Sequence, residues 1–153
     1  MQAMNVLLSR VGTNEAAVAA SKLQGATEGY SAMLLKTVGF KSECIRELSE
    51  GSLVFPWTSN KESLNAFGTV HGGVLSTLAD VFTRIHLKAA VPQLHVTSIS
   101  LEISFLSPVF EDKECVCVTR LVGKRDNTVF TNFSLEDGSG AIYARGSHIL
   151  SLS

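Results

Sequence analysis

A pair of glycines and an aspartate in the middle of the chain are the residues best suited to chemistry. The stretch from Asn65 to Asp80 reads NAFGTVHGGVLSTLAD. Gly72 and Gly73 are expected to begin a helix, whose first N–H groups lack intrahelical partners and carry the positive end of the helix dipole. Because glycine has no side chain, a ligand oxygen can approach these N–H groups closely, and the site could stabilise an oxyanion. An ordinary flexible junction between a loop and a helix would use the same glycines.

Two polar side chains flank this junction. Asn65 and His71 both offer hydrogen-bonding groups that could orient a carbonyl group or a water molecule. A single asparagine in a loop is also a common turn former, and a single histidine is a common surface or capping residue. Their joint position next to the two glycines favours a role in binding about as strongly as these structural roles.

Asp80 could act as a general base or as a nucleophile. It also lies one helical turn before Arg84, and a solvated pair of this kind contributes only about 0.2–0.5 kcal/mol. A partner guanidinium would favour the charged carboxylate, which suits a nucleophile better than a base. The helix rise separates Asp80 from Gly72 by about 12 Å. One chain therefore cannot bring both groups to the same carbonyl, and a catalytic Asp80 requires at least a dimer with antiparallel helices.

The strongest helix signal in the chain carries these residues. It runs from Gly72 to Lys88 and is followed by Pro92, which cannot continue a helix. One face is apolar at helical spacing. That face consists of Leu75, Leu78, Ala79, Phe82, Ile85 and Ala89.

Two predicted strands precede this helix and four follow it. The first pair comprises Ser42–Leu48 and Leu53–Thr58, with a turn at Glu50–Ser52 between them. Pro56 has no N–H, so the second strand should lie at a sheet edge or break there. The four later strands are His95–Leu106, Cys115–Val122, Thr128–Leu135 and Ala141–Leu150, with hairpin composition at 123–127 and 136–140.

The first strand after the helix alternates between apolar and polar residues, so one of its faces is expected to be buried. The apolar face comprises Ile99, Leu101, Ile103 and Phe105, and the polar face Ser98, Ser100, Glu102 and Ser104. A single long helix cannot connect parallel strands throughout the chain. The order of elements therefore predicts an α+β fold of the hotdog type, in which an antiparallel sheet wraps around one helix.

The segment before these elements is expected to be partly helical. Residues 15–33 are rich in alanine, but Gly25 and Gly29 should shorten or break a helix there. We predict an N-terminal extension over residues 1–36 and a hotdog domain over residues 37–153. The first 24 residues contain Arg10, Lys22 and a single acid, Glu15, which fits either a weak organelle presequence or an ordinary N-terminal segment. The expected compartment is cytoplasmic or mitochondrial.

Composition excludes several classes of function. The chain has 153 residues, 45% of them hydrophobic, and a formal net charge of -1. These values fit one globular domain and do not predict a nucleic-acid partner, which requires a basic face. No apolar run reaches the ~18 residues of a membrane-spanning helix. Three cysteines without paired spacing predict buried or half-buried thiols in a reducing compartment, and no metal or other cofactor is expected.

The stretch NAFGTVHGGVLSTLAD and the later run SISLEISFLSP resemble hotdog thioesterases of the phenylacetic-acid-degradation type, which include the acyl-CoA thioesterase 13 group. The resemblance spans roughly residues 42–150 and leaves the N-terminal extension unexplained. It implies that Asp80 is the general base or nucleophile and that the Gly72 N–H polarises the thioester carbonyl. It also implies that Asn65 and His71 position the water or the thioester, and that Ser98 assists Asp80.

The resemblance further implies an acyl-CoA thioesterase that works as a homodimer or homotetramer. Gly73 would contribute to substrate binding beside Gly72. The phosphates of CoA need a cationic contact, for which Lys124 and Arg125 at a hairpin tip are the candidates.

Two other functions stay open. A hotdog hydratase or dehydratase could pair His71 with Asp80 for proton transfer. A non-catalytic acyl-CoA-binding hotdog protein would need no carboxylate at position 80.

Overall fold

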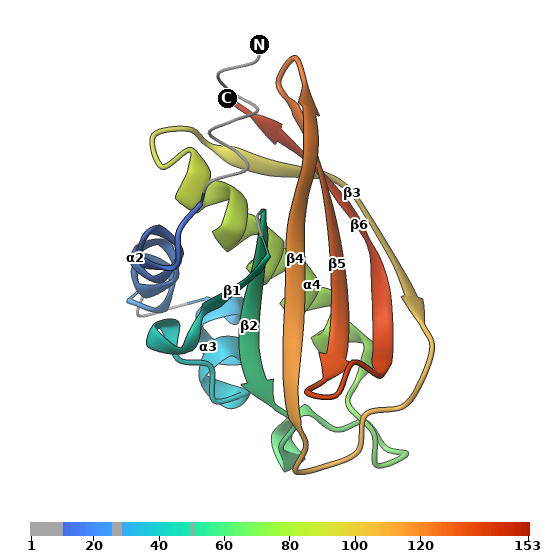
Figure 1. Cartoon of the computed structure of the whole chain (residues 1–153). Coiled ribbons are helices and arrows are strands. Elements are labelled where there is room, and N and C mark those ends of the chain that lie inside the picture. Colours follow the sequence, from blue (N-terminus) through green and yellow to red (C-terminus); the bar gives the residue numbers. More distant parts are fainter. Residues whose placement is uncertain (1–10, 26–28, 50) are drawn as a thin grey trace.

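A six-stranded antiparallel sheet curls around one long helix, α4 (Gly72–Ala90), as Figure 1 shows. The structure is a computed structural model that describes residues 11–25, 29–49 and 51–153. The order of strands in the sheet is β1-β2-β4-β5-β6-β3. This arrangement confirms the predicted α+β hotdog fold. The strands are β1 (Arg46–Ser49), β2 (Ser52–Thr58), β3 (Val96–Phe105), β4 (Glu114–Arg125), β5 (Thr128–Asp137) and β6 (Ile142–Leu152).

Helix α4 begins at the predicted residue and ends two residues later than predicted, at Ala90. The predicted apolar face is buried except for Ala89, which is half-buried. Phe82 anchors this face. Its ring stacks on Phe55 of β2 with centroids 4.7 Å apart, and its centroid lies 5.2 Å from that of Phe40. Burying such a side chain stabilises the fold by roughly 1.5–3 kcal/mol.

Two helices, α2 (Thr13–Gln24) and α3 (Tyr30–Thr37), precede the sheet. The predicted break of the alanine-rich helix is confirmed, since α3 starts after Gly29, whose φ of +125° suits glycine. Residues 1–10, the first part of the possible presequence, and residues 26–28 lie outside the described residues. Ala20 and Leu35 belong to the same apolar core as Phe82. The predicted domain boundary at residue 36 falls in the last turn of α3 and stays a prediction.

None of the helices within the described residues is long and apolar enough to cross a membrane.

The first predicted strand was partly wrong. Ser42–Cys44 forms a short 3-10 helix, and the strand itself is Arg46–Ser49. Glu50 of the predicted turn lies outside the described residues.

Pro56 does not break its strand. Strand β1 pairs with β2 only as far as Val54, whereas β4 pairs with β2 along its whole length. Pro56 therefore has a strand neighbour on one side only, as the missing N–H requires.

The hairpin between β4 and β5 is tighter than predicted. The strands continue to Arg125 and restart at Thr128, which leaves only Asp126 and Asn127 in the turn. Asp126 has a φ of +52°, the left-handed conformation that such two-residue turns require. Lys124 and Arg125 are consequently strand residues next to the turn.

Strand β3 contradicts the expectation of one buried face. It is an edge strand, and the exposed fractions of Ile99 and Phe105 are 58% and 54%. Its pairing with β6 shifts by one residue between Ser98 and Ser100. Because of this bulge, Ser98 lies on the same side of the sheet as Leu101, facing α4, although simple alternation predicted opposite faces.

Candidate active site

Asn65 shapes the loop that leads into α4. Its Oδ1 accepts hydrogen bonds from the N–H groups of Phe67 (2.9 Å) and Thr69 (3.2 Å). Its Nδ2 donates to the hydroxyl of Thr69 at 3.1 Å, which uses one of two amide protons. Asparagine favours such turns because its side chain mimics the backbone. The side chain is thus fixed, and it holds the segment that precedes His71 in one shape.

His71 caps the N-terminus of α4. Its Nδ1 accepts a hydrogen bond from the Gly73 N–H at 2.8 Å, and its own backbone N–H donates to Ser63 at 2.9 Å. Since Nδ1 is an acceptor, the proton of the neutral ring lies on Nε2. His71 is exposed, so this Nε2–H can donate to a bound molecule.

The two glycine amides at the start of α4 differ. The Gly73 N–H is engaged by His71, whereas the Gly72 N–H has no hydrogen-bond acceptor among the described residues. A free N–H at the positive end of a helix dipole is a ready donor for an oxyanion. Gly72 is therefore the available donor of the pair.

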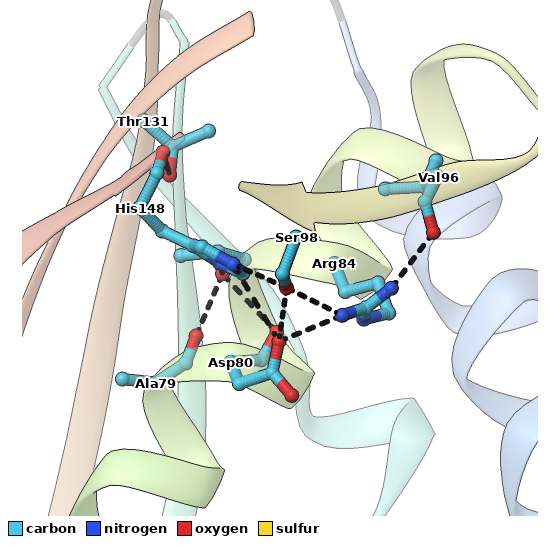
Figure 2. A network of polar contacts seen from close by, with 8 residues as sticks. Ala79, Asp80, Arg84, Val96, Ser98, Thr131 and His148 are labelled. Atoms are coloured by element: carbon cyan, nitrogen blue, oxygen red, sulfur yellow. Dashed lines mark hydrogen bonds and ion pairs between the residues drawn. The ribbon is translucent and has the colours of Figure 1, made fainter. Parts of the chain in front are cut away.

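Asp80 lies two turns further along α4, in a second polar cluster (Figure 2). All contacts of its carboxylate go to one oxygen, Oδ1. The nitrogen of Arg84 lies 3.0 Å from it, the hydroxyl of Ser98 3.2 Å and Nε2 of His148 3.6 Å. The other carboxylate oxygen points away from these groups (Figure 2). Asp80 thus has one anchored and one free oxygen.

Arg84 links the helix to the edge strand. Besides Asp80, its guanidinium donates to the carbonyl of Val96 at 2.8 Å and to the hydroxyl of Ser98 at 2.6 Å. The side chains of Arg84 and Asp80 are about one-third exposed, at 34% and 33%. The pair is therefore part of a network that fixes β3 against α4, and it is not an isolated surface ion pair.

The hydrogen-bond network has one consistent direction. The Thr83 hydroxyl donates its only proton to the carbonyl of Ala79 at 2.7 Å, so it accepts from Nδ1 of His148 at 2.6 Å. Nε2 of the neutral ring is then an acceptor, and Ser98 donates to it at 2.7 Å. Because Ser98 has a single hydroxyl proton, it can donate to Asp80 only if it no longer donates to His148.

Burial keeps His148 neutral. The side chain is fully buried, and desolvation lowers its pKa; the Asp80 carboxylate opposes this effect, and the Arg84 guanidinium adds to it.

The cysteines behave differently. Burial and the nearby Asp137 carboxylate raise the pKa of Cys115 to about 12, so this thiol is no nucleophile at neutral pH.

The structure brings some of the predicted residues together and leaves others apart. Asp80 and Ser98 meet, and so do His71 and Gly72, but the two pairs lie about 12 Å apart along α4 of one chain. Lys124 and Arg125 lie far from Gly72, on the hairpin at the end of the molecule where α4 ends (Figure 1).

His148 is a residue of the cluster that the sequence interpretation missed. A signal for it exists, because Ala144, Leu150 and Leu152 occupy the helix-facing positions of β6 and His148 falls on the same alternation. A histidine on a buried face needs hydrogen-bond partners. Thr83 of α4 is buried against this histidine and supplies one such partner.

Comparison with known proteins agrees with this architecture. Human acyl-coenzyme A thioesterase 13 is 25% identical over 99 residues, which is 64% of this chain and 71% of that protein. The PaaI protein of the E. coli phenylacetic acid degradation operon superposes with a TM-score of 0.66 at 19% identity, covering 79% of this chain and 88% of that chain. A hypothetical thioesterase of Streptococcus pneumoniae, solved with coenzyme A, superposes with a TM-score of 0.65 at 19% identity, covering 71% and 86%. The family model of the thioesterase superfamily matches residues 67–144, half of the chain and the whole stretch from the loop before α4 into β6. The chain therefore belongs to the thioesterase superfamily.

Proposed function

We propose that the protein is an acyl-CoA thioesterase that hydrolyses a fatty or aromatic acyl-CoA to the free acid and CoA. The observation that carries the proposal is the state of Asp80. One of its oxygens is held by Arg84 and lies 3.2 Å from the hydroxyl oxygen of Ser98, and the other is free to take a proton or attack a carbonyl. Nothing about the stability of the fold requires a free carboxylate oxygen at this place.

The proposed active site is shared between two chains. About 12 Å separate Asp80 from Gly72 along one helix, which is longer than a thioester group. Two α4 helices packed antiparallel would bring Asp80 of one chain to Gly72 of the other. The open edge of β3 supports such a dimer, because Ile99, which is 58% exposed, presents an apolar surface there that a second copy could cover. Two such dimers could associate further into a homotetramer.

The proposed reaction uses the start and the middle of α4 for different tasks. The thioester carbonyl oxygen accepts a hydrogen bond from the Gly72 N–H. Water attacks the carbonyl carbon, and the free oxygen of Asp80 takes one of its protons as the C–O bond forms. The oxyanion then re-forms the carbonyl as the C–S bond breaks, and the leaving CoA thiolate takes the proton from Asp80, which regenerates the carboxylate and balances the hydrolysis. His71, through its Nε2–H, and Asn65 lie on the Gly72 side and would position the thioester.

Direct attack by Asp80 on the carbonyl is the alternative form of this mechanism. It would give a mixed anhydride that water then hydrolyses. Arg84 keeps Asp80 in place in either case.

CoA as the thiol component rests on the relatives. The human relative is named an acyl-coenzyme A thioesterase, and the Streptococcus pneumoniae structure contains coenzyme A. Within this chain, Lys124 and Arg125 are the proposed contacts for CoA phosphates. Their hairpin lies at the end of the molecule where α4 ends, which an antiparallel partner would place near its own Gly72.

Replacing Asp80 with asparagine tests the proposal. Asp80→Asn keeps the size and the contact with Arg84 but removes the basic carboxylate, so kcat for acyl-CoA hydrolysis should fall by about 10²-fold or more. Asp112→Asn is the matched control, because Asp112 is exposed and lies in the loop before β4. Near-normal turnover by Asp80→Asn would rule out the mechanism.

Two further assays separate the alternatives. Asp80→Ala and His71→Ala subunits, each inactive alone, should regain activity when mixed, because one interface of the heterodimer keeps both intact partners. Failure of confirmed heterodimers would rule out only the shared site. Hydration of a 2-enoyl-CoA without release of thiol would instead identify a hydratase, and tight binding of acyl-CoA without turnover a binding protein.

A further inference from the structure

The ring of Phe105 lies against Gly72, the residue whose N–H is free at the start of α4. A methyl group added to Gly72 would stand 3.4 Å from Cζ and 3.5 Å from Cε1 of that ring, which is van der Waals contact. Phe105 is the last residue of β3, and 54% of it is exposed. The ring therefore borders the place where a ligand oxygen would meet the Gly72 N–H, and it has a face left to contact the ligand.

A cavity of about 320 Å³ opens beside this ring, between the start of α4 and the segment that follows β3. This volume is at the lower end of the roughly 300–1,000 Å³ that small-molecule sites occupy. Apolar side chains dominate its wall, namely Val70, Leu75, Phe105, Leu106 and Val109.

The chemistry of the wall distinguishes between the two arms of an acyl-CoA. The pantetheine arm carries amide groups, which lose free energy when buried without hydrogen-bond partners. The wall has two side-chain hydroxyls: that of Thr69 is already engaged with Asn65, and that of Ser107 belongs to an exposed residue. An acyl chain needs no such partners and gains free energy from apolar contact. The cavity thus fits the acyl arm.

We propose that Phe105 is a specificity-determining residue, whose ring contacts the acyl carbons next to the thioester and excludes substituents there. The inference rests on the proposed function, because it takes the Gly72 N–H as the group that binds the thioester oxygen. With the oxygen at Gly72, the carbon next to the carbonyl passes close to the ring. A straight chain can lie along the face of the ring, whereas a branch at that carbon collides with it.

Two substitutions of Phe105 test this selection. The ratio of kcat/KM for isobutyryl-CoA to that for butyryl-CoA measures tolerance of one branch. Phe105→Ala should raise this ratio by at least about tenfold, the scale on which one methyl group is discriminated in an apolar pocket. Phe105→Leu should raise it less, since leucine keeps part of the wall.

Phe130→Ala is the matched control. Phe130 is also a half-exposed phenylalanine, but it lies on β5 between the buried residues Val129 and Thr131, so its ring is on the outer face of the sheet. This variant should leave the ratio unchanged. The same ratio in wild type, Phe105→Ala and Phe105→Leu would overturn the inference.

Two parallel measurements keep the outcomes separable. Sedimentation checks assembly, because Phe105 is near the open edge of β3; if Phe105→Ala does not assemble, the ratio for Phe105→Leu decides. Asp80→Asn is assayed with both substrates. An inactive Asp80→Asn together with unchanged Phe105 ratios refutes only the role of Phe105, whereas an active Asp80→Asn refutes the proposed function itself.

Discussion

Nε2 of His148 lies 2.7 Å from the hydroxyl oxygen of Ser98, although the two residues are 50 positions apart and lie on different strands. The imidazole is fully buried, so a substrate cannot reach it. It accepts a hydrogen bond from Ser98, whose hydroxyl oxygen also lies close to Asp80. His148 is therefore a positioning residue. It fixes the direction of the Ser98 hydroxyl and, through Thr83, ties that direction to the backbone of α4.

Removing this imidazole should lower turnover more than binding. In His148→Ala the Ser98 hydroxyl loses its acceptor and can donate to Asp80 instead. We expect kcat to fall by about tenfold, which is less than for loss of the base itself, and KM to change little. His148→Gln should recover part of kcat, because its amide oxygen can accept the Ser98 proton. Steady-state kinetics with one acyl-CoA gives both quantities.

A second buried histidine provides the control. His86 is as buried as His148, but its Nδ1 contacts Thr119 at 2.8 Å, away from Asp80. His86→Gln should cost stability without changing kcat. An equal loss of kcat in His86→Gln and His148→Gln would mean that His148 acts only through the stability of the fold.

The hairpin cations should act on substrate affinity alone. Replacing Lys124 and Arg125 together with alanine should raise KM several-fold and leave kcat unchanged, because CoA phosphates lie far from the reacting carbon. The rise should shrink at high salt, where the wild type also loses this attraction. Lys41 and Arg46, replaced in the same way, are the control pair, since they lie just before and in the edge strand β1, whereas the hairpin joins the inner strands β4 and β5. Equal KM values in both double variants would remove the hairpin from the site.

The fold was predictable to the extent that periodicity determined it. The apolar stripe with Leu78 and Phe82 predicted α4, and the order of strands predicted the wrapped sheet. The edge strand was not predictable in detail, because alternation assumes an unbroken register. A single bulge after Ser98 moves that serine to the side of the sheet that faces the helix. No residue type in this segment predicts the bulge.

The candidate site was predictable only in its helical part. The i,i+4 spacing predicted the contact of Asp80 with Arg84, and eight residues of rise predicted its distance from Gly72. His148 depends on a register between β6 and β3 that local patterns do not define. The engagement of the Gly73 N–H by His71 depends on a side-chain rotamer, which a sequence does not state.

Acidification should destabilise the protein through its buried histidines. Burial lowers the pKa of His86 to about 3, against an ordinary value of 6.5 in the unfolded chain. Above pH 6.5 both states are neutral and the stability is fully present. Between about pH 6.5 and pH 3 the unfolded state binds a proton that the folded state does not bind. The free energy of unfolding therefore falls by up to about 1.4 kcal/mol per pH unit.

Urea unfolding between pH 7.5 and pH 5 measures this loss. His86→Gln is the comparison, because it removes the titrating group. The slope of the free energy of unfolding against pH should be smaller in this variant by the contribution of one histidine. An identical slope in the wild type and in His86→Gln would show that His86 is not held neutral by the fold.

The edge strand should be the element most sensitive to a single added methyl group. Gly146 of β6 lies opposite Ile103 of β3, and a Cβ on it would stand 1.8 Å from the carbonyl oxygen of Glu102 and 2.9 Å from the ring of Phe133. A backbone oxygen cannot move aside as a flexible side chain can, so Gly146→Ala must displace β3.

The free energy of unfolding should consequently fall by about 1–3 kcal/mol or more in Gly146→Ala, the usual cost of overpacking. Activity should fall as well, because β3 carries Ser98 to Asp80. Gly123→Ala is the matched strand variant, since no heavy atom lies within 4 Å of its added Cβ. It should be neutral or slightly stabilising, because alanine restricts the unfolded chain. Equal unfolding midpoints for the two variants would contradict the close contact between β6 and β3, and with it the way in which the edge strand holds Ser98 in the site.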